Sequence, residues 1–119
     1  MRYMVLLKAA QTSTPPPDGL MEGIAKLGEE AAKSGALLDT AGLAPSAGAR
    51  VNVVGGKLSV TDGPFTEAKE MISYALWEVS SKEEAIEWTS RFMKLHRDMW
   101  DGWEGEAEVL QVFEPPPGT

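Results

Sequence analysis

Hydrophobic and polar positions repeat with a helical period in two long segments of the chain. In the first, apolar residues recur every three or four positions from Leu20 onwards, with charged residues between them. Asp18 is expected to cap this helix and Gly35 to end it. In the second, Ser81 and Glu84 have the spacing of a capping box, and a broad apolar face follows. The pattern therefore predicts two amphipathic helices.

The remaining apolar runs are short, and most have the two-residue period of β-strands. A turn at Gly55-Gly56 separates two of them and predicts a hairpin, because glycine adopts positive φ without steric cost. The predicted strands are Arg2–Ala9, Ala36–Leu43, Arg50–Val54, Lys57–Thr61, Ile72–Val79 and Glu106–Glu114.

Without the hairpin, the order of elements is βαββαβ. This order predicts an α+β, ferredoxin-like sandwich, with both helices on one face of an antiparallel sheet. The first strand has Tyr3, Val5 and Leu7 on one face, and Met4 and Leu6 on the other. Because helices can cover only one face, a second apolar face is left for another surface. We therefore expect a homodimer that packs sheet on sheet.

Composition narrows the class of protein. With 119 residues, we expect a single domain over 1–114 and a tail over 115–119. The absence of cysteine excludes disulfides, thiolate nucleophiles and cysteine-based metal sites, and the net charge of -7 disfavours nucleic acid as a partner. No apolar run approaches the roughly 20 residues of a membrane span. Lys8 interrupts the N-terminal apolar run, so we predict a strand there rather than a signal peptide, and a cytoplasmic protein.

The stretch TDGPFTEAKE, residues 61–70, is the most distinctive segment of the chain. Asp62, Gly63 and Pro64 have the chemistry of a tight turn, which Phe65 would anchor in the core. A carboxylate held at a strand end by a rigid turn is equally a candidate general base or ligand contact. Both interpretations of Asp62 stay open at this point.

The charged residues after this turn also have two interpretations. Thr66, Glu67 and Lys69 either form a solvated helical turn or line a pocket beside Asp62. In the second case Lys69 would bind an anionic group of a substrate or lower the pKa of a carboxylate.

Other candidate site residues are scattered along the chain. His96 lies on the apolar face of the second helix, so it is either a core residue bonded to the backbone or an acid/base catalyst. Lys8 and Arg50 are either solvated strand-end charges or ligands for a carboxylate. With one histidine and no cysteine, we predict no metal site. No phosphate loop or dinucleotide fingerprint is present, and we predict no cofactor.

The segment TDGPFTEAKE resembles the signature of the DGPF group within the YCII-related domain family. The segments MRYMVLLKA, SSKEEAIEW and EAEVLQVFE are similar to the first strand, the start of the second helix and the last strand of that family. The resemblance implies the dimeric α/β-barrel form of the ferredoxin-like fold.

The resemblance implies less about activity. Some members of the DGPF group are associated with extracytoplasmic-function sigma factors, and wider relatives include enzymes that act on small ring-cleavage products with a His/Asp pair. His96 does not stand where those relatives place their histidine. Ser73 and Tyr74 stand where many members have glycine, and Leu110 stands where many have arginine. We therefore count Tyr74 among the candidate ligand contacts.

Three functions are compatible with these observations. The first is a small-molecule-binding protein or cofactor-independent enzyme, with Asp62 and His96 as candidate catalytic residues and a small anionic organic ligand. The second is a non-catalytic regulatory partner, for example of a sigma factor. The third is a purely structural dimer module.

Overall fold

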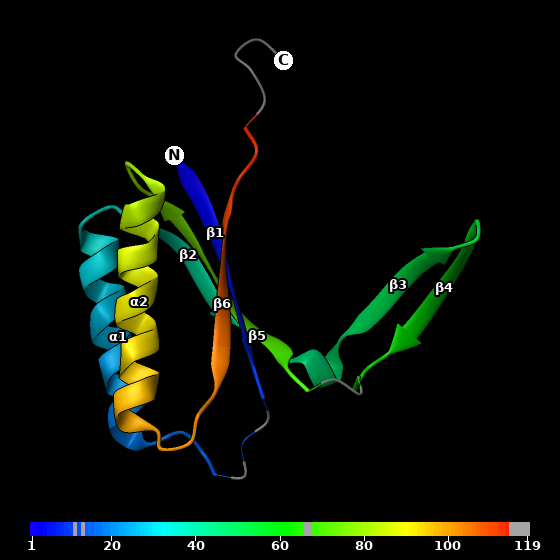
Figure 1. Ribbon diagram of the computed structural model, residues 1–119, viewed down its shortest axis with the longest axis horizontal. Coiled ribbons are helices and arrows are strands. Elements are labelled where there is room, and N and C mark those ends of the chain that lie inside the picture. The colour runs from blue at the N-terminus through cyan, green and yellow to red at the C-terminus, as the bar shows by residue number, and fades with distance from the viewer. Residues whose placement is uncertain (11, 13, 66–67, 115–119) are drawn as a thin grey trace.

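The computed structural model describes residues 1–10, 12, 14–65 and 68–114. Two helices lie side by side over one face of a four-stranded antiparallel sheet of order β2-β5-β1-β6 (Figure 1). This arrangement is an α+β fold compatible with the ferredoxin-like fold. The elements are β1 (Arg2–Ala9), α1 (Asp18–Lys33), β2 (Leu37–Gly42), the 3-10 helix η1 (Pro45–Ala47), β3 (Ala49–Val54), β4 (Lys57–Asp62), β5 (Glu70–Glu78), α2 (Lys82–Met99) and β6 (Gly105–Gln111).

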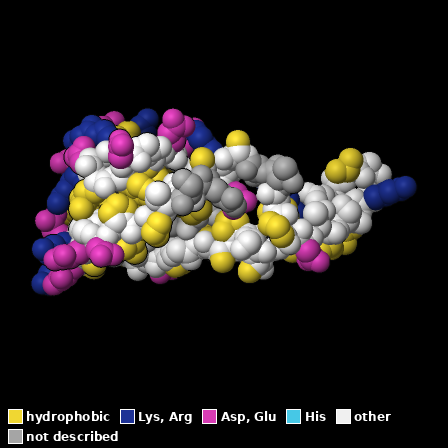
Figure 2. All heavy atoms as spheres, turned by 90° about the horizontal axis from the view of Figure 1, so that it is seen from below, with side chains coloured by type: hydrophobic (Ala, Val, Ile, Leu, Met, Phe, Trp, Pro, Cys, Tyr) yellow, Lys and Arg dark blue, Asp and Glu magenta, His cyan; other side chains and the backbone are white. Residues whose placement is uncertain are grey.

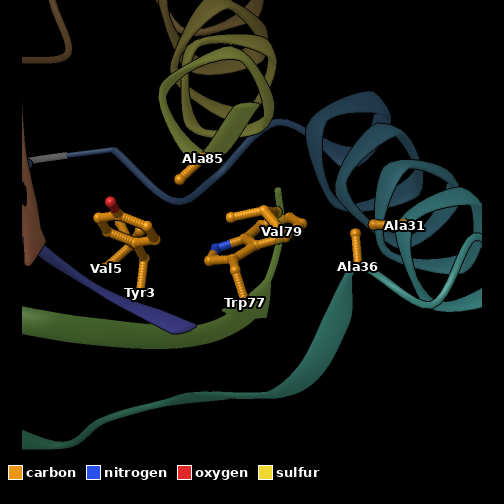
Figure 3. Close-up of a cluster of buried hydrophobic side chains, with 7 residues drawn as sticks. All are labelled: Tyr3, Val5, Ala31, Ala36, Trp77, Val79 and Ala85. Atoms are coloured by element: carbon orange, nitrogen blue, oxygen red, sulfur yellow. The ribbon is translucent and has the colours of Figure 1, made fainter. Parts of the chain in front are cut away.

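The core lies between the helices and the two central strands. Tyr3 pairs with Trp77 across β1 and β5, and both side chains point toward the helices. Ala85 of α2 lies above Tyr3 and Trp77, and Ala31 of α1 lies next to Ala36; neither Ala31 nor Ala85 retains any solvent exposure (Figure 3). The rings of Trp77 and Trp88 stack with centroids 5.6 Å apart. Such aromatic pairs contribute about 0.5–1.5 kcal/mol beyond their burial.

The helix ends follow the sequence signals in part. Ser81 caps α2 as predicted, because its Oγ accepts a hydrogen bond from the Glu84 backbone N–H at 3.1 Å. Gly35 follows the last turn of α1 with φ of 84°, again as predicted. The prediction for Asp18 was wrong. Pro17 occupies the cap position without a side-chain bond, and Asp18 is the first helical residue, where its carboxylate still favours the positive end of the helix dipole.

Strands β3 and β4 pair only with each other and project away from the rest of the molecule (Figure 1). Their register sets Val51 opposite Val60, and Val53 opposite Leu58, on one face of the ribbon. These four side chains are 65 to 71% exposed. Figure 2 shows hydrophobic atoms at the surface of this arm, beyond the body of the molecule. A two-stranded ribbon is marginally stable by itself, and the apolar face of this ribbon is exposed to solvent.

The sheet also has an open face, which the helices do not cover. It carries Met4 and Leu6 from β1, Leu76 from β5 and Leu110 from β6, which alternate with the core residues along each strand. The predicted pair of apolar faces on the central strands is therefore present. Among the described residues, no helix is both long enough and apolar enough to cross a membrane.

Candidate functional site

The Asp-Gly-Pro-Phe turn packs against the loop that precedes the arm. The backbone N–H of Gly63 donates to the carbonyl oxygen of Gly48 at 2.8 Å. A Cβ atom on Gly63 would lie 2.7 Å from the carbonyl oxygen of Pro45, closer than such atoms approach. Glycine is therefore required here by the close approach of two backbone segments. The Gly63–Pro64 peptide bond is cis.

A hollow of about 600 Å³ opens beside this turn, and we call it the cationic hollow. Lys8 from the end of β1, Arg50 from the start of β3, and Lys69 line it. Phe65 and Met71 supply apolar wall, and the Arg50 guanidinium carbon lies 3.9 Å above the Phe65 ring centroid. This cation–π contact holds an arginine and an aromatic ring together in the wall. The prediction that Phe65 anchors the turn in the core was wrong, because its side chain is half-buried in the wall of this hollow.

The charge of this wall differs from that of the whole protein. The chain carries a net charge of -7, yet the described residues of the hollow include three cations and one carboxylate, Glu70. Lys8 is also tied to the sheet, because its Nζ lies 3.1 Å from Oε1 of Glu108 on β6. A local cationic surface in an acidic protein is suited to an anion.

The other predicted site residues lie in different parts of the molecule. Asp62 ends β4, is exposed, and pairs with Ala49, which itself lines the hollow. Tyr74 lies on the open face, and its hydroxyl donates to Oδ2 of Asp39 at 2.8 Å. That hydrogen bond raises the pKa of the Tyr74 phenol. Thr66 and Glu67 lie outside the described residues.

His96 has the surroundings of a core residue. It is 5% exposed, and its Nδ1 lies 3.0 Å from the carbonyl oxygen of Phe92, to which it donates. Its ring lies between those of Phe92 and Trp103, with centroids 4.6 and 4.5 Å away. Burial lowers the pKa of His96 below its ordinary 6.5. Because α2 and the arm lie at opposite ends of the molecule (Figure 1), His96 does not meet Asp62.

Sequence reasoning missed the segment that completes the hollow. Residues 43–45 and 48–49 line it, and they belong to the loop around η1. The sequence feature that could have identified this segment is the run of small residues APSAGA, which permits close approach of two backbone segments. A larger open groove of about 930 Å³ lies between α2 and β6 and shares Lys69 with the hollow, but the Asp-Gly-Pro-Phe turn does not line it. Within the described ranges, no cluster of three or more histidines and carboxylates could hold a metal.

The close approach at Gly63 generates a stability prediction. Gly63→Ala should lower the free energy of unfolding by about 1–3 kcal/mol, because the new methyl group overpacks a backbone contact. Gly42→Ala is the matched control, since its Cβ would come no nearer than 4.0 Å to the Ile72 carbonyl oxygen. Urea denaturation of both variants measures the difference. Equal stability of the two would contradict the close approach.

The burial of His96 generates a pH prediction. Its folded pKa is lowered, so the unfolded chain takes up a proton first as the pH falls through 6.5. Stability is therefore full above that value and falls as the pH drops toward the lowered folded pKa. Thermal melts across this range should show a steeper loss for wild type than for His96→Leu, in which the other acid-sensitive groups are unchanged. Parallel curves would show that His96 does not titrate on unfolding.

Comparison with known proteins agrees with the sequence resemblance at the level of the family. A model of the YCII-related domain matches residues 1–98, from β1 through the Asp-Gly-Pro-Phe turn into the last turn of α2. A search of the curated proteins finds no match to the chain. Assignment to the narrower DGPF group stays a prediction from the motif. Because the matched range covers most of the sequence, the protein belongs to the YCII-related domain family.

Proposed function

We propose that the protein binds a small organic anion in the cationic hollow. The observation that carries this proposal is the convergence of Lys8, Arg50 and Lys69, from three distant segments, on one depression. Its volume of about 600 Å³ falls in the range of about 300–1,000 Å³ that is typical of small-molecule sites.

The chemistry of the wall supports a carboxylate attached to an apolar body. Guanidinium and ammonium groups form charge-assisted hydrogen bonds to carboxylates, which are about twice as strong as neutral ones. Phe65 and Met71 offer apolar contact to the rest of such a molecule. The cationic and the apolar side chains line the same hollow, so a single ligand can contact both.

We assign Asp62 as the candidate base for proton transfer to or from this ligand. Asp62 ends β4 next to the wall of the hollow, on the strand that leads into the Asp-Gly-Pro-Phe turn. Asp62 is not among the residues that line the hollow, and its pairing partner Ala49 alternates with Arg50 along β3, so the Asp62 carboxylate would reach a carbon or oxygen acid held by the cations only at the edge of the hollow. His96 has no part in this proposal, because it is buried within the helical layer.

We also propose that the protein is a homodimer in which the open faces of two sheets pack together as an α/β barrel. Met4, Leu6 and Leu76 form the centre of that face, and monomeric proteins rarely expose contiguous apolar patches of this kind. Lys8 follows Leu6 on the same face and lines the hollow, so the second copy would lie close to one wall of the hollow. The apolar side of the arm would pack on that copy as well. A regulatory partner protein is the alternative occupant of these surfaces.

Ligand binding is tested by thermal shift. Among small carboxylates and their uncharged amides, we expect carboxylates alone to raise the melting temperature, since a ligand at 100 times its Kd stabilises by about 2.7 kcal/mol. Arg50→Gln and Lys69→Gln should each weaken binding by about 10- to 100-fold, the effect of losing one charged hydrogen bond. Lys57→Gln, at the tip of the arm and outside the hollow, should bind like wild type. A carboxylate that shifts all three variants equally would exclude the hollow as its site.

The homodimer is tested by sedimentation velocity. We expect wild type to sediment with twice the mass of one chain, and Leu6→Glu to sediment as a monomer, because a charge would be buried at the centre of the interface. Met21→Glu, at an exposed position on α1, should remain a dimer. Circular dichroism checks that Leu6→Glu keeps its fold. A wild-type monomer, or a dimer that tolerates Leu6→Glu, would contradict the sheet-on-sheet arrangement.

A further inference from the structure

We infer that the protein has a second binding site, for a small neutral molecule with an apolar body and one hydrogen-bond acceptor, inside the fold. The site is an interior cavity of about 100 Å³ between the helical layer and the sheet. Its walls come from both helices and from β1, β2, β5 and β6, with Ile24, Leu27, Leu7 and Phe92 among them. This inference does not depend on the cationic hollow, which lies outside the helical layer.

The walls of the interior cavity exclude a charged ligand. No lining residue among those described carries a charged side chain, and a charge without a partner is costly to bury. Two of the lining hydroxyls are already committed as donors. Thr40 donates to the carbonyl oxygen of Tyr74 at 2.7 Å, and Thr89 donates to that of Ala85 at 2.8 Å. The ligand is therefore neutral and mostly apolar.

One donor in the cavity wall has no partner. Trp77 is 6% exposed, and its indole Nε1 is buried without any hydrogen bond among the described residues. Figure 3 shows this nitrogen on the side of the ring toward Tyr3 and Val5, and of these two residues Val5 lines the cavity together with Trp77. An unsatisfied buried donor costs about 1–3 kcal/mol, so native structures rarely contain one. A ligand carbonyl or ether oxygen would satisfy it.

Gly28 marks an entrance to the interior cavity. It lies within α1 and lines the cavity with Thr40 of β2, and both residues retain solvent exposure. Glycine inside a helix costs about 1 kcal/mol relative to alanine. At Gly19 and Gly23 packing explains the glycine, because an added Cβ would lie 2.7 Å from Met99 and 3.3 Å from Leu95. At Gly28 an added Cβ would meet nothing within 4 Å, so packing does not explain it. An open passage into the cavity at this position explains the glycine.

The size of the interior cavity limits its ligand. A cavity of about 150 Å³ with apolar walls is known to accommodate benzene, which has six heavy atoms, so about 100 Å³ suits a molecule of about four heavy atoms. Water alone is a poor occupant of such a space, because a buried water needs about two to four polar partners. Acetone is a matching probe, with two methyl groups and one carbonyl acceptor. 2-Methylpropene has the same shape without the acceptor.

The experiment is a titration of ¹⁵N-labelled protein with each probe, followed by NMR. The indole N–H signal of Trp77, assigned by its loss in Trp77→Phe, should move downfield and saturate with acetone. 2-Methylpropene should bind about tenfold more weakly, the difference made by one neutral hydrogen bond. In Trp77→Phe the two probes should bind equally. An indole signal that moves with neither probe would overturn the inference.

Variants at the entrance separate the interior cavity from surface binding. Gly28→Leu should abolish saturable binding of both probes, because its side chain enters open space at the mouth of the cavity. Ala25→Leu, at an exposed position on the same helix, should leave binding unchanged. If Gly28→Leu does not fold, Gly28→Met tests the same point with an unbranched side chain that favours helix, and it should also abolish binding. Binding that survives at Gly28 variants that fold would overturn the assignment to this cavity.

Discussion

The two-residue period of β1 is the constraint on which the rest of the structure depends. This strand lies between β5 and β6, and successive side chains point to opposite faces of the sheet. Tyr3, Val5 and Leu7 meet the helices, whereas Met4, Leu6 and Lys8 do not. A register shift of one residue would exchange these two sets, so the core and the open face are specified together.

The helical layer then determines which chemistry each side of the sheet can hold. On the covered side water is excluded, so each buried polar group either forms a hydrogen bond within the protein or is left unsatisfied. Thr89 and His96 are bonded to backbone carbonyls there, and the indole N–H of Trp77 is not. On the uncovered side, Lys8 is half-buried and forms an ion pair with Glu108. The proposed interior site and the proposed cationic hollow therefore have different electrostatic surroundings.

The arm and the Asp-Gly-Pro-Phe turn form the other structural unit. The turn is held by the hydrogen bond between Gly63 and Gly48, which joins the two ends of the arm at its base. This closure brings Arg50 and Phe65 into contact, although fourteen positions separate them along the chain, and both residues line the hollow. The motif therefore has a structural role in closing the base of the arm, and its Phe65 lines the hollow in which we propose that a ligand binds.

Much of the fold could be predicted from the sequence, because helices and strands reflect local periodicity. The bounds of β1, the cap at Ser81 and the glycine end of α1 were all predicted from a few neighbouring residues. The candidate cations Lys8, Arg50 and Lys69 could be named, yet nothing in their spacing brings them to one hollow. Only the tertiary structure decided that, because their meeting depends on strand order and on a backbone contact between residues far apart in sequence. The same holds for Trp77 and Gly28, since a cavity is a property of the space between packed elements and has no local pattern in the chain.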